Sequence, residues 1–209
     1  MTEPAVPDAG EPSITPEERR LLLRWARRAI EAAVGGASGP SVREADLTDE
    51  LRVPHAAFVT LTLHGGLRGC IGRLEYERPL WENVLAAAAA AALDDPRFPP
   101  VEARELPELE IEISVLTPPV DLPDARLFDP LRQGIIVERG YRRGLFLPGV
   151  GPEAGWGREE TLAAVCRKAG LPAAAWREPG VRLQVFRTVA FAEPATDRDA
   201  AQGARPEKE

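Results

Sequence analysis

The sequence predicts an α+β fold with largely antiparallel strand pairing, on three observations. Segments with strand-like composition are joined to one another by tight turns, so neighbouring strands form hairpins. Segments with helical periodicity are spread between these hairpins and do not alternate regularly with single strands. No glycine pattern of a dinucleotide-binding or phosphate-binding loop is present. With 209 residues, 44% of them hydrophobic, the chain is long enough to bury a core without disulfides or metals.

The first predicted element is a helix that begins at Pro16. Thr15 is placed to cap it, and Glu18 follows three residues later as in a capping box. Residues 1–15 contain three prolines and no apolar period, which indicates a flexible N-terminal tail. Gly35 and Gly36 end the helix, whose apolar residues recur at helical spacing: Leu22, Trp25, Ala26, Ala29, Ile30 and Ala33.

A hairpin and a second helix follow. Residues 57–63 are rich in β-branched and aromatic types and predict a strand, and His64-Gly65-Gly66 predicts the turn into a strand at 67–72. A helix is predicted from Pro79 to about Leu93, ended by residues 94–100.

The remaining elements are mostly strands. Residues 108–116 alternate between apolar and polar side chains, which predicts a half-buried strand stopped by two prolines. Residues 134–138 and 143–147 predict a second hairpin, 158–169 a third helix and 181–191 one last long strand. The polar tail at 194–209 is expected to be disordered, so the folded domain should span 16–193.

Composition argues against several functional classes. The net charge of −7 is concentrated in the two ends, and no basic run suggests a nucleic-acid or anionic-membrane partner. No run of about 20 apolar residues could span a membrane. Two cysteines indicate reduced thiols and a cytoplasmic location, and their spacing from the two histidines predicts no metal site.

The most distinctive chemistry surrounds Cys70, in the run LRGCIG at 67–72. Side chains alternate along a strand, so Arg68, Cys70 and Gly72 are expected to share one face. A guanidinium beside Cys70 would favour the thiolate and lower the pKa of the thiol. Gly69 and Gly72 flank the cysteine and are candidates for close approach by a ligand or another backbone.

Other candidate site residues come from elsewhere in the chain. Glu110 and Glu112 occupy the polar face of the strand at 108–116 and could supply acid–base groups if that strand joins the same sheet. His55 precedes the first strand and could act as a base, and Arg97 could bind an anionic group. The alternative is structural: a small cysteine on a strand is usually packed, strand carboxylates are usually solvated, and Arg97 would bond to carbonyls or a carboxylate.

Taken in order, these motifs resemble the AMMECR family, called AmmeMemoRadiSam system protein A in prokaryotes. The matching runs cover roughly residues 16–193. They are FVTL at 58–61, LRGCIG at 67–72, DPRFPPV at 95–101, EL–LEIEISVL–PP within 105–119, GLFLP at 144–148, KAGLP at 168–172, Trp176, Phe186 and Phe191. One departure is Gly149, which stands where the family usually has glutamine.

The resemblance implies a fold in two parts, with a smaller α+β subdomain and a cleft between the parts near the LRGCIG motif. It also implies a pathway shared with a Memo-like protein and a radical-SAM protein, and it names no substrate or cofactor. We therefore expect an enzyme or enzyme component that uses the cleft, with Cys70 as thiol nucleophile or contact to a small-molecule ligand. The alternative is a non-catalytic adaptor that binds pathway partners.

Overall fold

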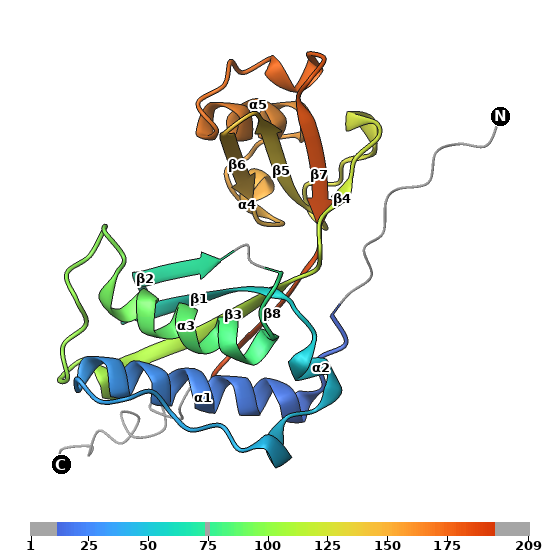
Figure 1. Ribbon diagram of the computed structural model, residues 1–209. Helices are drawn as coiled ribbons and strands as arrows, with labels where there is room; N and C mark the ends of the chain where they lie inside the picture. The colour runs from blue at the N-terminus through green and yellow to red at the C-terminus, as the bar shows by residue number, and fades with distance from the viewer. Residues whose placement is uncertain (1–11, 74–75, 195–209) are drawn as a thin grey trace, which may run out of the picture.

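The computed structural model describes residues 12–73 and 76–194, which form two lobes, each built on its own four-stranded antiparallel sheet (Figure 1). Of the expected tails at 1–15 and 194–209, residues 1–11 and 195–209 lie outside the described ranges. In chain order the elements are α1 (Pro16–Val34), α2 (Asp49–Arg52), β1 (Ala56–Leu63), β2 (Gly66–Arg73), α3 (Leu80–Leu93), β3 (Leu109–Leu116), β4 (Val120–Asp121), β5 (Gly134–Arg139), β6 (Arg142–Phe146), α4 (Val150–Glu153), α5 (Arg158–Lys168), β7 (Arg182–Phe186) and β8 (Thr188–Ala192).

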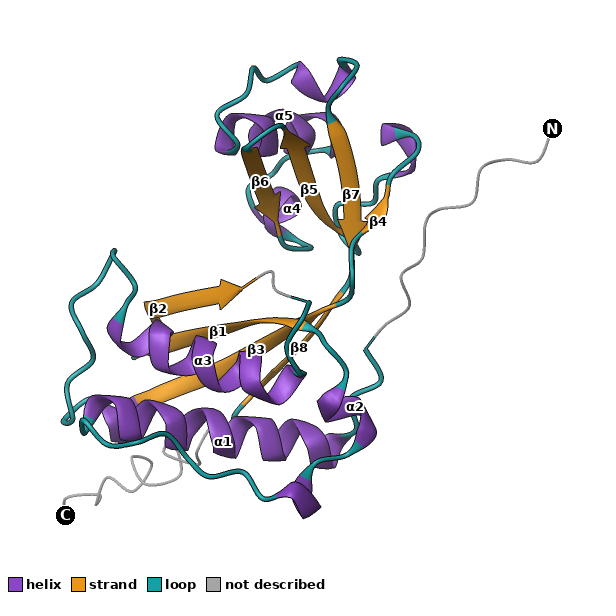
Figure 2. Cartoon of the chain, in the orientation of Figure 1, coloured by secondary structure: helices purple, strands orange, loops and turns teal. Residues whose placement is uncertain are grey.

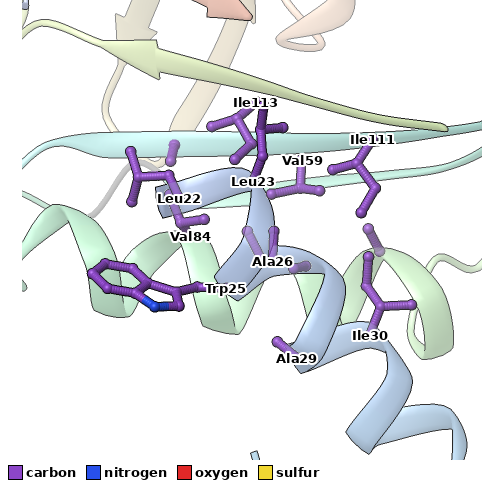
Figure 3. Packing of buried hydrophobic residues seen from close by; sticks show 14 of the residues in the cluster. Leu22, Leu23, Trp25, Ala26, Ala29, Ile30, Val59, Val84, Ile111 and Ile113 are labelled. Atoms are coloured by element: carbon purple, nitrogen blue, oxygen red, sulfur yellow. The ribbon is translucent and has the colours of Figure 1, made fainter. Parts of the chain in front are cut away.

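The first lobe packs α1 and α3 against one face of the sheet β2-β1-β3-β8 (Figure 2). The predicted capping box is present: Thr15 accepts from the Glu18 backbone, and the Glu18 carboxylate accepts from the Thr15 N–H at 2.8 Å. Ile14 belongs to the segment 1–15 that was expected to be a flexible tail, but it is buried in this core beside the helix start. Leu22 and Ile30 of α1 meet the inward side chains of β1 and β3, as Figure 3 shows.

The inward face of this sheet follows the predicted alternation. Val59 of β1 lies between Ile71 of β2 and Ile113 of β3, and all three pack toward the helices. The opposite, outer face carries Phe58, Thr60 and their cross-strand neighbours. We call this second surface the outer face below, because the helices leave it uncovered and the second lobe lies on that side (Figure 1).

The second lobe has the strand order β4-β7-β5-β6, with α5 packed against one side of its sheet. Its core is a separate cluster that includes Leu162 and Val165 of α5 with Ile135 and Val137 of β5. Cys166 of α5 is fully buried there. This lobe is the smaller α+β subdomain that the resemblance implies.

The two lobes are joined by two adjacent connections, residues 117–119 and Arg187. The Thr117 N–H donates to the Arg187 carbonyl at 3.0 Å, and the Arg187 N–H donates to the Thr117 hydroxyl at 2.9 Å. A third apolar cluster joins the lobes; its buried members are Ala56, Leu116, Ile136 and Phe186. The prediction of one strand over 181–191 is wrong: the segment breaks at Arg187, so β7 belongs to the second sheet and β8 to the first.

Candidate functional site

Three polar side chains form a row across the outer face of the first sheet. Thr60 of β1 pairs with Cys70 of β2 on one side and with Glu112 of β3 on the other. Residues paired across neighbouring antiparallel strands share a face, so all three side chains project from the same surface. The expectation that Cys70 and Glu112 belong to one sheet face is met, with a threonine between them.

Within this row, Thr60 is hydrogen-bonded to Cys70. Its hydroxyl donates a hydrogen bond to the Cys70 sulfur, with an oxygen–sulfur distance of 3.3 Å. Cys70 and Thr60 are both half-buried, whereas Glu112 is exposed. Within residues 12–73 and 76–194, the Glu112 carboxylate makes no hydrogen bond or ion pair, so it is available to a bound molecule. Glu110 lies one pair further along and accepts a hydrogen bond from Thr62 at 3.3 Å.

The free edge of β2 is covered at Cys70 by the loop that follows α3. The Cys70 N–H donates to the Asp95 carboxylate at 2.8 Å, and the Arg97 guanidinium donates to the Cys70 carbonyl at 3.2 Å. Asp95 also accepts from the Arg97 side chain at 2.7 Å. These bonds, the one from Arg97 first, hold the pKa of the buried Asp95 carboxyl well below its usual range. The backbone of Cys70 is thereby fixed from the side opposite β1.

Arg97 is a cation close to Cys70, because its guanidinium donates to the Cys70 carbonyl. The pKa of Arg97 is raised chiefly by its hydrogen bonds to Asp95, and the Cys70 side chain adds to this effect, so the guanidinium lies beside the thiol. Arg97 keeps 54% of its side chain exposed despite these contacts. Lys168 of the second lobe lies close enough to Arg97 for the two positive charges to repel each other. Desolvation is the main cause that lowers the pKa of Lys168, and the charge of Arg97 lowers it further.

Arg68 does not take the position expected for it. The pairing of β1 and β2 shifts between Leu61 and Thr62, so Arg68 is the extra residue of a β-bulge. Its guanidinium pairs with Glu105 at 2.7 and 2.9 Å and donates to the carbonyls of Pro99 and Pro100. The side chain is only 12% exposed in this ion pair, which also raises the pKa of Arg68. The expectation that Arg68 acts directly on Cys70 therefore gains no support from its contacts.

The two glycines of the motif face opposite sides of the sheet. A Cβ at Gly69 would lie 2.2 Å from the Ala91 carbonyl oxygen of α3, and a Cβ at Gly72 would lie 2.2 Å from the Phe58 ring. The predicted close approach is thus made by a helix backbone at Gly69 and by an aromatic ring at Gly72. Both positions support the site by packing.

His55 lies away from this row. It is buried at the opposite end of β1, with Nδ1 3.3 Å from the Leu116 carbonyl oxygen and Nε2 3.5 Å from the Glu50 carboxylate. It lies five positions before Thr60, which corresponds to about 16 Å along a strand. His55 therefore cannot serve as a base for Cys70 in this arrangement.

Sequence reasoning missed Thr60, Asp95 and Lys168. The alternation in AFVTLTL did place Thr60 on the polar face, so this signal was available. Asp95 and Lys168 are distant in sequence and carry no comparable signal.

No group of three or more His, Cys, Asp or Glu side chains in the described ranges is arranged to hold a metal ion. The same ranges contain no helix long and apolar enough to cross a membrane.

Comparisons with known proteins agree on one family. The AMMECR1 family model matches residues 23–191. A protein of Methanothermobacter thermautotrophicus is 43% identical over 185 residues, covering 85% of this chain and 95% of the relative. Protein TK0174 of Thermococcus kodakarensis is 42% identical over 190 residues, with 86% and 92% covered.

A solved structure has the same fold. The crystal structure of the uncharacterized protein PH0010 from Pyrococcus horikoshii superposes with a TM-score of 0.80 at 39% identity, covering 86% of this chain and 93% of that one. The family match spans both lobes, from α1 to β8, and includes the Cys70 row and its supporting loop. The chain belongs to the AMMECR1 family.

Proposed function

We propose that this protein is an enzyme, or the substrate-binding component of one, and that a small molecule binds on the outer face around Cys70. The observation that carries the proposal is the hydrogen bond from Thr60 to the Cys70 sulfur, in a row that ends at the unpaired Glu112. A packed structural cysteine needs neither a hydroxyl donor nor a neighbouring guanidinium. Cys70 has both, and it is partly open to solvent.

Each group has a chemical role in this proposal. Cys70 would be the nucleophile, with the Thr60 hydroxyl as hydrogen-bond donor to its sulfur and the Arg97 guanidinium as the cation beside it. Glu112 lies two strands from Cys70, about 10 Å between backbones, so a small substrate could lie between the thiol and the carboxylate. In that position the carboxylate would accept or deliver a proton at the substrate. Arg97 and Lys168 would favour a substrate with a negative charge on the β2 side.

The first experiment is the pH dependence of thiol alkylation, read for each cysteine separately by mass spectrometry of the native protein. Cys166 is the internal control, because burial raises the pKa of its thiol and the side chain has no exposed surface. We expect Cys70 to react quickly below the reference thiol pKa of about 8.5, while Cys166 stays unmodified. If Cys70 reacts as slowly as Cys166, the nucleophile role is refuted.

A pair of variants separates a nucleophile from a ligand contact. Cys70→Ser keeps the shape and a hydrogen-bonding group but removes the thiolate, so a nucleophilic reaction should stop while ligand binding persists. Glu112→Gln removes the charge from an exposed side chain and should leave folding intact. An activity that survives both substitutions would place the chemistry elsewhere.

The second candidate is an adaptor that binds partner proteins, and one observation favours it. Tyr141 is 92% exposed at the turn between β5 and β6, and tyrosine is a residue type enriched at protein–protein interfaces. The resemblance implies a Memo-like and a radical-SAM protein as partners. Titration with those two proteins from the same organism tests this candidate: the adaptor reading expects binding that Tyr141→Ala weakens and Cys70→Ser leaves unchanged.

A further inference from the structure

A second polar site lies on the first lobe, on the far side of the helices from the Cys70 row. The segment that follows α1 runs back along that helix before α2, as Figure 1 shows. Between this segment and α1 is a cavity of about 370 Å³. Its charged lining consists of Arg24 and Arg28 from α1 and of Arg43 and Asp46 from the returning segment.

The side chains that line this cavity carry more positive than negative charge. Arg43 donates to both carboxylate oxygens of Asp46, at 2.9 and 2.7 Å, so these two charges neutralise each other. The hydrogen bonds from Arg43 are the main cause that lowers the pKa of Asp46, and the charge of Arg24 lowers it further. Arg24 itself forms no hydrogen bond or ion pair within the described residues. Arg28 likewise has no carboxylate partner there. Arg24 and Arg28 therefore line the cavity without a carboxylate that is hydrogen-bonded or ion-paired to either of them in the described part of the chain.

The spacing of the two arginines makes this arrangement costly for the isolated helix. Residues four apart lie on one face of a helix, and like charges there repel each other. Among the helix positions three and four residues from Arg24 and Arg28, the one carboxylate is Glu31. Its charge acts on Arg27, and it forms no ion pair with Arg28 within the described residues. The repulsion would be relieved by an external anion that bridges both guanidinium groups.

We propose that this cavity binds the phosphate group of a small phosphorylated organic molecule. Guanidinium groups present planar pairs of donors that match phosphate oxygens, and two of them balance the charge of about −1.5 to −2 that a phosphate monoester carries near neutral pH. Ser41 also lines the cavity and can donate its hydroxyl. The volume exceeds what a phosphate alone fills, and Leu21 and Trp25 form an apolar wall for the organic part.

This site is independent of the proposed reaction at Cys70. The α1 helix packs on the inward face of the first sheet, whereas Cys70, Thr60 and Glu112 project from the outer face. Loss of phosphate binding would leave thiol reactivity unchanged. Conversely, an unreactive Cys70 would not affect phosphate binding, so the two proposals fail separately.

The test uses the full-length protein labelled with ¹⁵N and titrated with phenyl phosphate, inorganic phosphate and phenol. We expect saturable chemical-shift changes around Arg24, Arg28 and Ser41 with phenyl phosphate. Inorganic phosphate should bind more weakly, because it does not use the apolar wall, and phenol should not bind at these residues. The double variant Arg24→Gln/Arg28→Gln should weaken phenyl phosphate binding at least tenfold, by losing charge-assisted bonds.

Arg20→Gln is the matched control, because Arg20 lies on the same helix outside the cavity and pairs with Glu17 at 3.4 Å. It should bind phenyl phosphate as the wild type does. All three arginines are exposed, so both variants should keep the wild-type circular dichroism and melting temperature. The proposal is overturned if phenyl phosphate gives no saturable shifts up to about 10 mM, a weak-binding limit, or if Arg20→Gln loses binding as much as the double variant.

Discussion

The substitution Gly69→Ala should destabilise the first lobe, because β2 and α3 leave no room for a methyl group. The added Cβ would lie 2.2 Å from the Ala91 carbonyl oxygen and 3.2 Å from its carbonyl carbon. Reaching ordinary contact at 3.4 Å requires the helix and the strand to separate by about 1.2 Å. Both partners are backbone, so no side chain can rotate away. Overpacking of this kind costs about 2–3 kcal/mol in unfolding free energy.

Gly66→Ala is the matched control for this prediction. It lies in the same strand, and its Cβ would lie 3.5 Å from the Leu63 carbonyl oxygen, which is an ordinary contact. Urea denaturation should place Gly69→Ala about 2–3 kcal/mol below the wild type, with a melting temperature lower by about 4 to 12 °C. Gly66→Ala should stay within about 0.5 kcal/mol of the wild type. Equal stability of the two variants would contradict the packing role of Gly69 and favour contact with a ligand instead.

Three further predictions concern the site and its supports. Asp95→Asn should lower stability at neutral pH by removing the charged partner of Arg97. Because folding depresses the pKa of Asp95, the wild type should lose this advantage as pH falls below about 4; urea curves that show the same difference at pH 7 and pH 3 would contradict this. Thr60→Val should slow alkylation of Cys70 about threefold or more by removing the hydroxyl donor, and an unchanged rate would separate Thr60 from thiol reactivity. Gly149→Gln should cost about 1 kcal/mol in thermal unfolding, since Gly149 has a φ of +85°; an unchanged melting temperature would show that glutamine is tolerated there.

Local patterns predicted the elements that depend on local chemistry. The capping box at Thr15, the hairpin turn at 64–66 and the alternation at 108–116 all recur in the structure. The break at Arg187 was not predictable from the same kind of signal. Residues on both sides of it favour strand structure, and a single intervening residue gives no composition change. Only the pairing of β7 and β8 with different sheets separates them.

For the candidate site, too, sequence patterns predicted the features that depend on local alternation and not those that depend on contacts between distant segments. Alternation placed Cys70 and Glu112 on one face, and that prediction agrees with the register. It misplaced Arg68, because a bulge between β1 and β2 adds one residue that no sequence pattern marks. Arg97 was a candidate for anion binding, with a bond to carbonyls or a carboxylate as the alternative. Its carboxylate partner, Asp95, is only two residues away, but its bond to the Cys70 carbonyl spans 27 residues and depends on how the loop packs against β2.

The insertion of the second lobe between β3 and β8 has a consequence for how the chain folds. The free side of β3 receives β8 only after residues 120–186 have been synthesised, because β8 follows them in the chain. Until then the emerging first lobe has β3 as an open sheet edge, which is the kind of surface on which strands of other chains aggregate. Closing a loop of this length is also entropically slow. The second lobe, folding early on its own core, would bring Phe186 back beside Leu116 and so shorten the search by which β8 completes the first sheet.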